Sequence, residues 1–160
     1  MMNVKKNYGV ILLFIASIIA LGIAYIAQYL FGMSPCKLCI YERIPYFITI
    51  GLFIIYLFKP FKVISFLVYL CYMCNICVSG YHVALEHSLV ADIIGCTDSI
   101  KSLNFDDLKN ALLNVITVVS CDRPSIVFMG LSLAECNLIY CVLCLILGVY
   151  LFVKQYVTKR

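Results

Sequence analysis

Charged side chains are scarce in this sequence. Of its 160 residues only 12% are Asp, Glu, Lys or Arg, whereas 64% are hydrophobic. A water-soluble domain of this size does not need so much apolar surface, so the composition excludes a soluble globular protein. Runs of about 18 or more nearly uncharged apolar residues indicate membrane spans. We therefore expect one integral membrane domain over residues 1–160.

Tryptophan is absent, and the sequence contains neither an internal repeat nor a low-complexity segment. The absence of repeats excludes a repeat array. The aromatic side chains that fit a belt at the membrane edge are all tyrosines, namely Tyr41, Tyr46 and Tyr81.

Four apolar segments predict membrane spans, at about residues 8–31, 40–58, 63–85 and 133–153. We expect the first to be an uncleaved anchor, because it is too long for the core of a signal peptide. The second is clearly apolar only from Ile44 to Phe58, which is about 22 Å of helix against a hydrocarbon core of about 30 Å. Its helix must therefore begin near Leu38 to Ile40, with Glu42 and Arg43 in the headgroup region. The expected fold is an all-α, four-transmembrane-helix bundle with outward loops at about 32–39 and 86–132.

The long second loop contains one more helical pattern. Asn104 followed by Asp106 and Asp107 is typical of a capped helix start. Apolar residues then recur at helical spacing: Phe105, Leu108, Leu112, Val115, Ile116 and Val119. We predict a short interfacial helix on the membrane surface, although an ordinary helix within a small folded loop fits the same pattern.

Positive charge is concentrated on one side of the predicted bundle. The two ends of the chain and the turn between spans two and three hold seven of the twelve Lys and Arg residues: Lys5, Lys6, Lys59, Lys62, Lys154, Lys159 and Arg160. No acidic residue lies on that side, and all eight fall in the two other loops or at their membrane edge. The positive-inside rule then places both termini in the cytoplasm and the two loops outside.

Four of the ten cysteines belong to the outward side: Cys36, Cys39, Cys96 and Cys121. An even number of cysteines in an oxidising compartment favours disulfides, with Cys96 and Cys121 pairing across the long loop. A bridge between Cys36 and Cys39 closes too short a loop to stabilise the fold much, so this pair suits reversible redox chemistry. Two structural disulfides are one alternative. A four-cysteine zinc site is another, and it is disfavoured because zinc thiolate sites suit reducing compartments.

The other six cysteines lie inside spans three and four: Cys71, Cys74, Cys77, Cys136, Cys141 and Cys144. Their spacing repeats the helical period, so it does not indicate a motif. We interpret them as small apolar packing residues. No resident metal is expected.

Three polar residues near the membrane edge are candidates for binding an electron acceptor. Arg43 follows Cys39 by about one helical turn, where a cation stabilises a thiolate or hydrogen-bonds a carbonyl oxygen. Snorkelling to the interface or pairing with Glu42 is the alternative. Glu86 and His87 end span three on the same side, where His87 is placed to donate to the acceptor or shuttle its protons. His82 lies deeper and is interpreted as a packed helix residue. Glu135 opens span four and is expected to reach the headgroups.

The stretch Pro35-Cys36-Lys37-Leu38-Cys39-Ile40-Tyr41-Glu42-Arg43 resembles the Pro-Cys-x-x-Cys-x-x-x-Arg signature of the disulfide-bond formation protein B (DsbB) family of bacterial inner-membrane thiol oxidases. Glu86-His87 is similar to the family's Glu-His after span three. Cys96 and Cys121 match its second cysteine pair by location, and the run from Phe128 to Leu131 also fits. The chain departs from the family in one respect: it has no tryptophan, which is common in the family's second loop.

This resemblance implies a relay. A soluble, periplasmic, thioredoxin-like (DsbA-like) thiol oxidase in its reduced form attacks the Cys96–Cys121 disulfide, at Cys96. The electrons pass by exchange to Cys36 and Cys39. A membrane quinone, ubiquinone or menaquinone, then reoxidises that pair through a Cys39 thiolate near Arg43. No nucleic acid is expected as a partner.

Three other functions remain open from the residues. A quinone reductase of the vitamin K epoxide reductase type is also a small helical bundle, but its active Cys-x-x-Cys is expected in a late span. A thiolate-based membrane metal handler would use the cysteines of spans three and four. A non-catalytic scaffold would keep its two disulfides closed.

Overall fold

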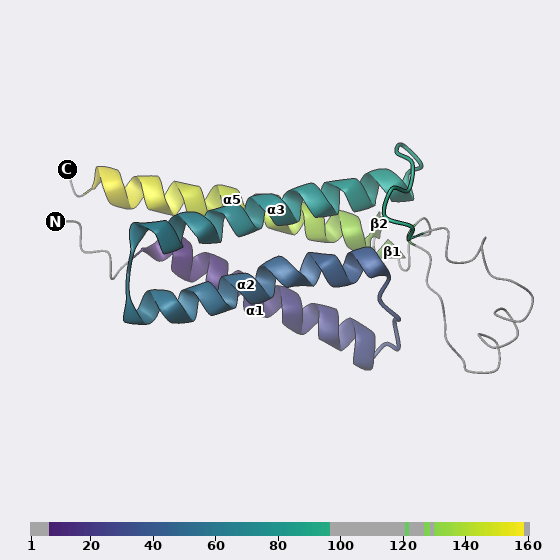
Figure 1. Ribbon diagram of the computed structural model, residues 1–160, viewed down its shortest axis with the longest axis horizontal. Helices are drawn as coiled ribbons and strands as arrows, with labels where there is room; N and C mark the ends of the chain where they lie inside the picture. The colour runs from purple at the N-terminus through teal and green to yellow at the C-terminus, as the bar shows by residue number, and fades with distance from the viewer. Residues whose placement is uncertain (1–6, 97–120, 122–126, 129, 159–160) are drawn as a thin grey trace, which may run out of the picture.

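The computed structural model describes residues 7–96, 121, 127–128 and 130–158. Within them, four long helices dominate, and a two-stranded antiparallel hairpin precedes the last of them (Figure 1). The helices are α1 (Tyr8–Tyr29), α2 (Lys37–Phe58), α3 (Lys62–Glu86) and α5 (Leu133–Val157), and the strands are β1 (Val127–Phe128) and β2 (Leu131–Ser132). Each helix is long and apolar enough to cross a membrane. The chain is a multi-pass membrane protein, and the predicted all-α bundle is confirmed.

The helices run alternately up and down the bundle. α1 packs on α2 and α5, and α3 packs on the same two helices, so the order around the bundle is α1, α2, α3, α5. The start of α1 meets the end of α5, where the Tyr8 amide donates to Gln155 Oε1 at 3.3 Å. The α2–α3 turn lies at this same end, and the α1–α2 connection and the end of α3 lie at the other (Figure 1). The predicted interfacial helix of the long loop lies outside the described residues.

Side-chain caps set where three of the helices begin. Asn7 Oδ1 accepts from the Gly9 amide at the start of α1. Ser132 and Glu135 form a reciprocal capping box at the start of α5. α2 begins at Lys37, with Cys36 as its N-cap, so its helix reaches slightly further back than the predicted start near residues 38–40. This earlier start makes the first cysteine of the motif the N-cap of the helix.

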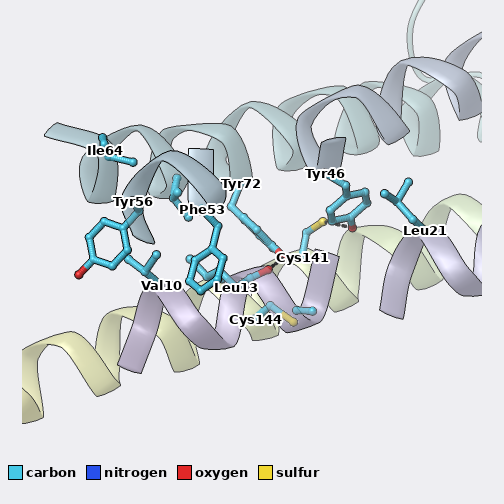
Figure 2. Close-up of a cluster of buried hydrophobic side chains, with 12 residues drawn as sticks. Val10, Leu13, Leu21, Tyr46, Phe53, Tyr56, Ile64, Tyr72, Cys141 and Cys144 are labelled. Atoms are coloured by element: carbon cyan, nitrogen blue, oxygen red, sulfur yellow. Dashed lines mark hydrogen bonds between the residues drawn. The ribbon is translucent and has the colours of Figure 1, made fainter. Parts of the chain in front are cut away.

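The main core cluster lies between the four helices and mixes apolar and hydroxyl side chains (Figure 2). Tyr72 is almost completely buried, and its hydroxyl donates to the Leu13 carbonyl at 2.8 Å and lies 3.0 Å from the Ser17 hydroxyl. Phe14 and Phe53 stack with ring centroids 4.0 Å apart. Inside a membrane each buried polar group needs a partner within the protein, so these bonds join α1 to α3 where water is absent.

The outer surface of the bundle is apolar. Large hydrophobic side chains such as Ile23, Phe66 and Ile146 are more than half exposed, as expected of helices that face lipid. Cys74 and Cys77 belong to this exposed surface, whereas Cys141 and Cys144 are buried in the core. The predicted packing role therefore fits Cys141 and Cys144 most directly.

Candidate functional site

The Cys-x-x-Cys pair lies at the start of α2. Cys36 is the N-cap, and its Sγ accepts from the Cys39 amide at 3.2 Å. The two sulfurs lie 2.8 Å apart and are free thiols. The hydrogen bond with the Cys39 thiol lowers the pKa of Cys36 below that of an ordinary thiol. A helix N-terminus with a second thiol beside it is a setting that favours a reactive thiolate.

The segment after α3 folds back over this helix start. The Tyr81 hydroxyl donates to the Ala91 carbonyl at 3.3 Å and accepts from the Ile93 amide at 3.0 Å. Lys37 Nζ, on the first residue of α2, donates to the Gly95 carbonyl at 3.0 Å. Gly95 has a φ of 66°, which L side chains rarely adopt, so a glycine suits the turn just before Cys96. These contacts hold the segment against α2.

The second cysteine pair is a disulfide packed against the first pair. Cys96 and Cys121 are bonded, with their Cα atoms 5.6 Å apart. Both are buried in one cluster with Cys36, and Cys39 packs on the edge of that cluster. The four cysteines that the sequence singled out are therefore brought together, although 25 residues separate Cys96 from Cys121.

Cys39 also faces a cavity of about 220 Å³ between α1, α2 and α5. Most of its wall is apolar, and its polar lining comes from Glu42, Arg43, Tyr46, Asn137 and Tyr140. Cys36 does not belong to this lining as far as the described residues show. Of the two thiols, Cys36 is buried in the cluster with the disulfide, and Cys39 lines the cavity.

Arg43 lines the cavity and is held in place by α1. Its guanidinium donates to Gln28 Oε1 at 2.6 Å and lies 5.1 Å from the centre of the Tyr25 ring. Both contacts leave part of the five-donor guanidinium available to other groups. A fixed cation with donors at the wall of an apolar cavity suits a neutral ligand that carries carbonyl oxygens.

Glu42 lies inside the bundle, which corrects the expectation that it sits among the headgroups. It is only 7% exposed, and its carboxylate accepts from His82 Nδ1 at 2.7 Å and from Asn137 Nδ2 at 2.9 Å. The other ring nitrogen of His82, Nε2, lies 3.6 Å from Cys36 Sγ. A carboxylate costs several kcal/mol to bury unless it is paired, so these two donors account for its position.

Sequence reasoning missed the connection between His82 and the thiol, because it took His82 only as a packed residue. One signal was present in span three. Polar residues recur there at helical spacing, at Asn75, Ser79, His82 and Glu86, and all of them are buried or nearly so. In an apolar span such a row marks an inward face, and Ser79, His82 and Glu86 each meet a polar partner there.

Glu86 and His87 fasten α3 to the start of α5. The Ser132 hydroxyl donates to the Glu86 carboxylate, and His87 Nε2 lies 2.8 Å from Glu135 Oε1. Among the described residues that line the cavity, neither Glu86 nor His87 is present. Glu135 is therefore engaged in a helix cap and a contact with His87, and its place among the headgroups stays a prediction.

A membrane bundle that holds a Cys-x-x-Cys dithiol against a second disulfide defines a class of membrane-bound thiol–disulfide oxidoreductases. Comparison with known families supports this class and narrows it. The family described as "Disulfide bond formation protein DsbB" matches residues 6–151. The chain belongs to the DsbB family, a family of thiol oxidoreductases that act in disulfide bond formation.

One relative has similarity along nearly its whole length. The uncharacterized protein RP370 of Rickettsia prowazekii (strain Madrid E) is 34% identical over 156 residues, which cover 92% of this chain and 90% of the relative. No solved structure matches the chain significantly.

Proposed function

We propose that this protein reoxidises a periplasmic, thioredoxin-like (DsbA-like) thiol oxidase and passes the electrons to a membrane quinone. One observation carries the proposal. The Cys36–Cys39 pair packs in one cluster with the Cys96–Cys121 disulfide, and Cys39 also lines the cavity. A pair in this position can take electrons from a disulfide partner and release them into the bundle.

The transfer proceeds by thiol–disulfide exchange. The reduced partner attacks the Cys96–Cys121 disulfide, at Cys96, and leaves as a disulfide, so that Cys96 and Cys121 become thiols. These two thiols then reduce a Cys36–Cys39 disulfide and are themselves reoxidised. Each step moves two electrons and two protons.

His82 assists exchange at Cys36. A thiolate that forms there during exchange has the His82 Nε2 group 3.6 Å away. The Glu42 carboxylate holds the imidazole from the other side and fixes its orientation. With Nδ1 donating to Glu42, Nε2 donates when His82 is protonated, and this imidazolium stabilises the negative charge on sulfur and makes Cys36 a better leaving group.

The cavity fits a quinone head group. Its wall is largely apolar, as a ring requires, and Cys39 lines it together with a few polar groups. A quinone bound there would accept two electrons and two protons. Arg43 would hold a carbonyl oxygen, with Cys39 as the thiol next to the acceptor. Glu86 and His87, which the sequence suggested as further acceptor ligands, we assign instead to positioning the loop end of α3 against α5.

The proposed orientation places the disulfide end of the bundle in the periplasm of a bacterial inner membrane and both termini in the cytoplasm. The charge pattern of the sequence supports this. The turn between α2 and α3 carries Lys59 and Lys62 at the end opposite to the cysteines. A soluble thiol oxidase outside the membrane then meets the Cys96–Cys121 disulfide directly.

The test is quinone reduction by purified protein with a reduced thioredoxin-like oxidase as electron donor. Cys36→Ser and Cys39→Ser should each abolish donor-dependent quinone reduction. Cys136→Ser is the matched control, because it makes the same change in a residue that lines the same cavity. It should keep nearly full activity. Turnover that survives the loss of Cys36 and Cys39 contradicts the proposal.

A further inference from the structure

The two active thiols and His82 form a cluster that resembles a metal site. We propose that the reduced protein binds one zinc-like divalent ion through Cys36 Sγ, Cys39 Sγ and His82 Nε2. All three atoms lie within 4.8 Å of one another. This site differs from the four-cysteine site considered from the sequence, because Cys96 and Cys121 are bonded to each other and a histidine takes part.

The distances suit zinc with a small rearrangement. In a tetrahedral site with Zn–S of about 2.3 Å and Zn–N of about 2.0 Å, sulfur and nitrogen lie about 3.6 Å apart and two sulfurs about 3.8 Å apart. Cys36 Sγ and His82 Nε2 already lie 3.6 Å apart. The two sulfurs are 2.8 Å apart and must separate by about 1 Å, which a rotation of the Cys39 side chain supplies.

The hydrogen bonds around His82 also suit a metal ligand. Ligating histidines almost always donate their second ring nitrogen to a carboxylate or carbonyl, which fixes the ring. His82 has this arrangement, because Nδ1 contacts Glu42 Oε1 at 2.7 Å and leaves Nε2 toward the thiols. Two thiolates and a neutral imidazole neutralise a divalent ion, so the bound site carries little net charge in a region of low dielectric constant.

Such binding would stop the relay. A bound ion occupies both sulfurs, and the Cys36–Cys39 disulfide cannot form until the ion leaves. Only the dithiol state offers both ligands, so the oxidised protein should not bind the ion. This consequence rests on the proposed function, whereas binding itself does not.

Cobalt(II) is the probe, because thiolate ligands give it a charge-transfer band in the near ultraviolet and tetrahedral coordination gives strong visible bands. The purified protein in detergent is reduced anaerobically, freed of reductant and titrated with cobalt(II), without donor or quinone. We expect one ion per protein and loss of the bands when zinc is added. Cys36→Ser, Cys39→Ser and His82→Gln should each weaken or abolish them. Glu42→Gln should lower the affinity by about 10–100-fold, as measured for outer-shell partners of histidine ligands.

Three controls separate this site from other thiols. Cys74→Ser, an exposed cysteine of α3, should leave the titration unchanged. The double variant Cys96→Ser, Cys121→Ser should keep the bands, and their loss would instead indicate the four-cysteine site. The oxidised protein retains the six cysteines of α3 and α5 as thiols and should give no bands. Cobalt(II) binding that is unchanged in His82→Gln, or that persists after oxidation of the protein, overturns the inference.

A second readout connects binding to turnover. Zinc added to the reduced wild-type protein should inhibit donor-dependent quinone reduction, and a chelator should restore it. Glu42→Gln should need a proportionately higher zinc concentration for the same inhibition. If cobalt(II) binds as expected but zinc leaves turnover unaffected, the inhibitory consequence is wrong while the metal site stands. If quinone reduction itself is absent, the proposed function fails and the titration still decides the site.

Discussion

Replacing Glu42 with alanine should destabilise the bundle by several kcal/mol. The carboxylate is 7% exposed and accepts two hydrogen bonds, from His82 Nδ1 at 2.7 Å and from Asn137 Nδ2 at 2.9 Å. Glu42→Ala leaves His82 Nδ1 without its acceptor, whereas Asn137 Nδ2 still donates to Ser79 Oγ at 3.1 Å, and an unpaired buried group costs about 1–3 kcal/mol. Removing one partner of a buried pair costs about 3–5 kcal/mol in all. The cost of an unpaired donor is already included in the cost of breaking the buried pair. We therefore expect the free energy of unfolding to fall by about 3–5 kcal/mol, not by the sum of the two figures.

Glu42→Gln should cost less, about 1–3 kcal/mol, because its amide oxygen still accepts from one donor. The assay is unfolding by dodecyl sulfate in mixed micelles, followed by circular dichroism. Tyr41→Phe is the control, since Tyr41 is an exposed neighbour, and it should leave the free energy of unfolding unchanged. Hydrogen bonds between membrane helices average only about 0.6 kcal/mol in measured cycles. A loss no larger than this for Glu42→Ala would refute the reasoning that a buried carboxylate and two donors depend on one another.

Three further outcomes follow from the site. Arg43→Ala should raise the KM for quinone about tenfold or more in steady-state assays, with kcat less affected, because a charge-assisted hydrogen bond contributes about 1.5–3 kcal/mol. Arg43→Lys should recover part of the affinity for quinone. An unchanged KM for Arg43→Ala would remove Arg43 from the quinone site. His87→Gln should leave the quinone KM unchanged, because His87 pairs with Glu135 at the end of the bundle; a clear rise would restore it as a quinone ligand. The double variant Cys96→Ser, Cys121→Ser should no longer oxidise the protein partner. It should still reduce quinone with dithiothreitol as donor, since a small dithiol can reach Cys36 and Cys39 once the covering disulfide is gone. Loss of both activities would contradict separate roles for the two cysteine pairs.

The fold was largely predictable because hydropathy acts locally along the chain. The four spans correspond to α1, α2, α3 and α5, and the need for a longer second helix correctly anticipated a start before Tyr41. The hairpin β1–β2 was not predicted, since each strand has only two residues and shows no alternating pattern. Gly130, with a φ of 89°, was the one local sign of its turn.

The site was predictable only in part, for a geometric reason. Cysteine spacing and charge singled out Arg43 and the four cysteines that the structure brings together. Consecutive residues of a helix point about 100° apart, so Glu42 and Arg43 face different neighbours even though they are adjacent in sequence. Which of them turns inward depends on where His82 and Asn137 lie on α3 and α5, and that is a property of the packed bundle.

The division of labour between Cys36 and Cys39 is the central claim, and single-turnover kinetics of Cys39→Ser test it most directly. The variant, with its Cys96–Cys121 disulfide intact, is mixed with reduced donor and quinone, and both donor oxidation and quinol formation are followed. About one donor should be oxidised per protein, because the Cys96–Cys121 disulfide still exchanges with it. No quinol should form. Continued quinol formation would contradict the claim, because electrons would then reach the cavity without the thiol that faces it.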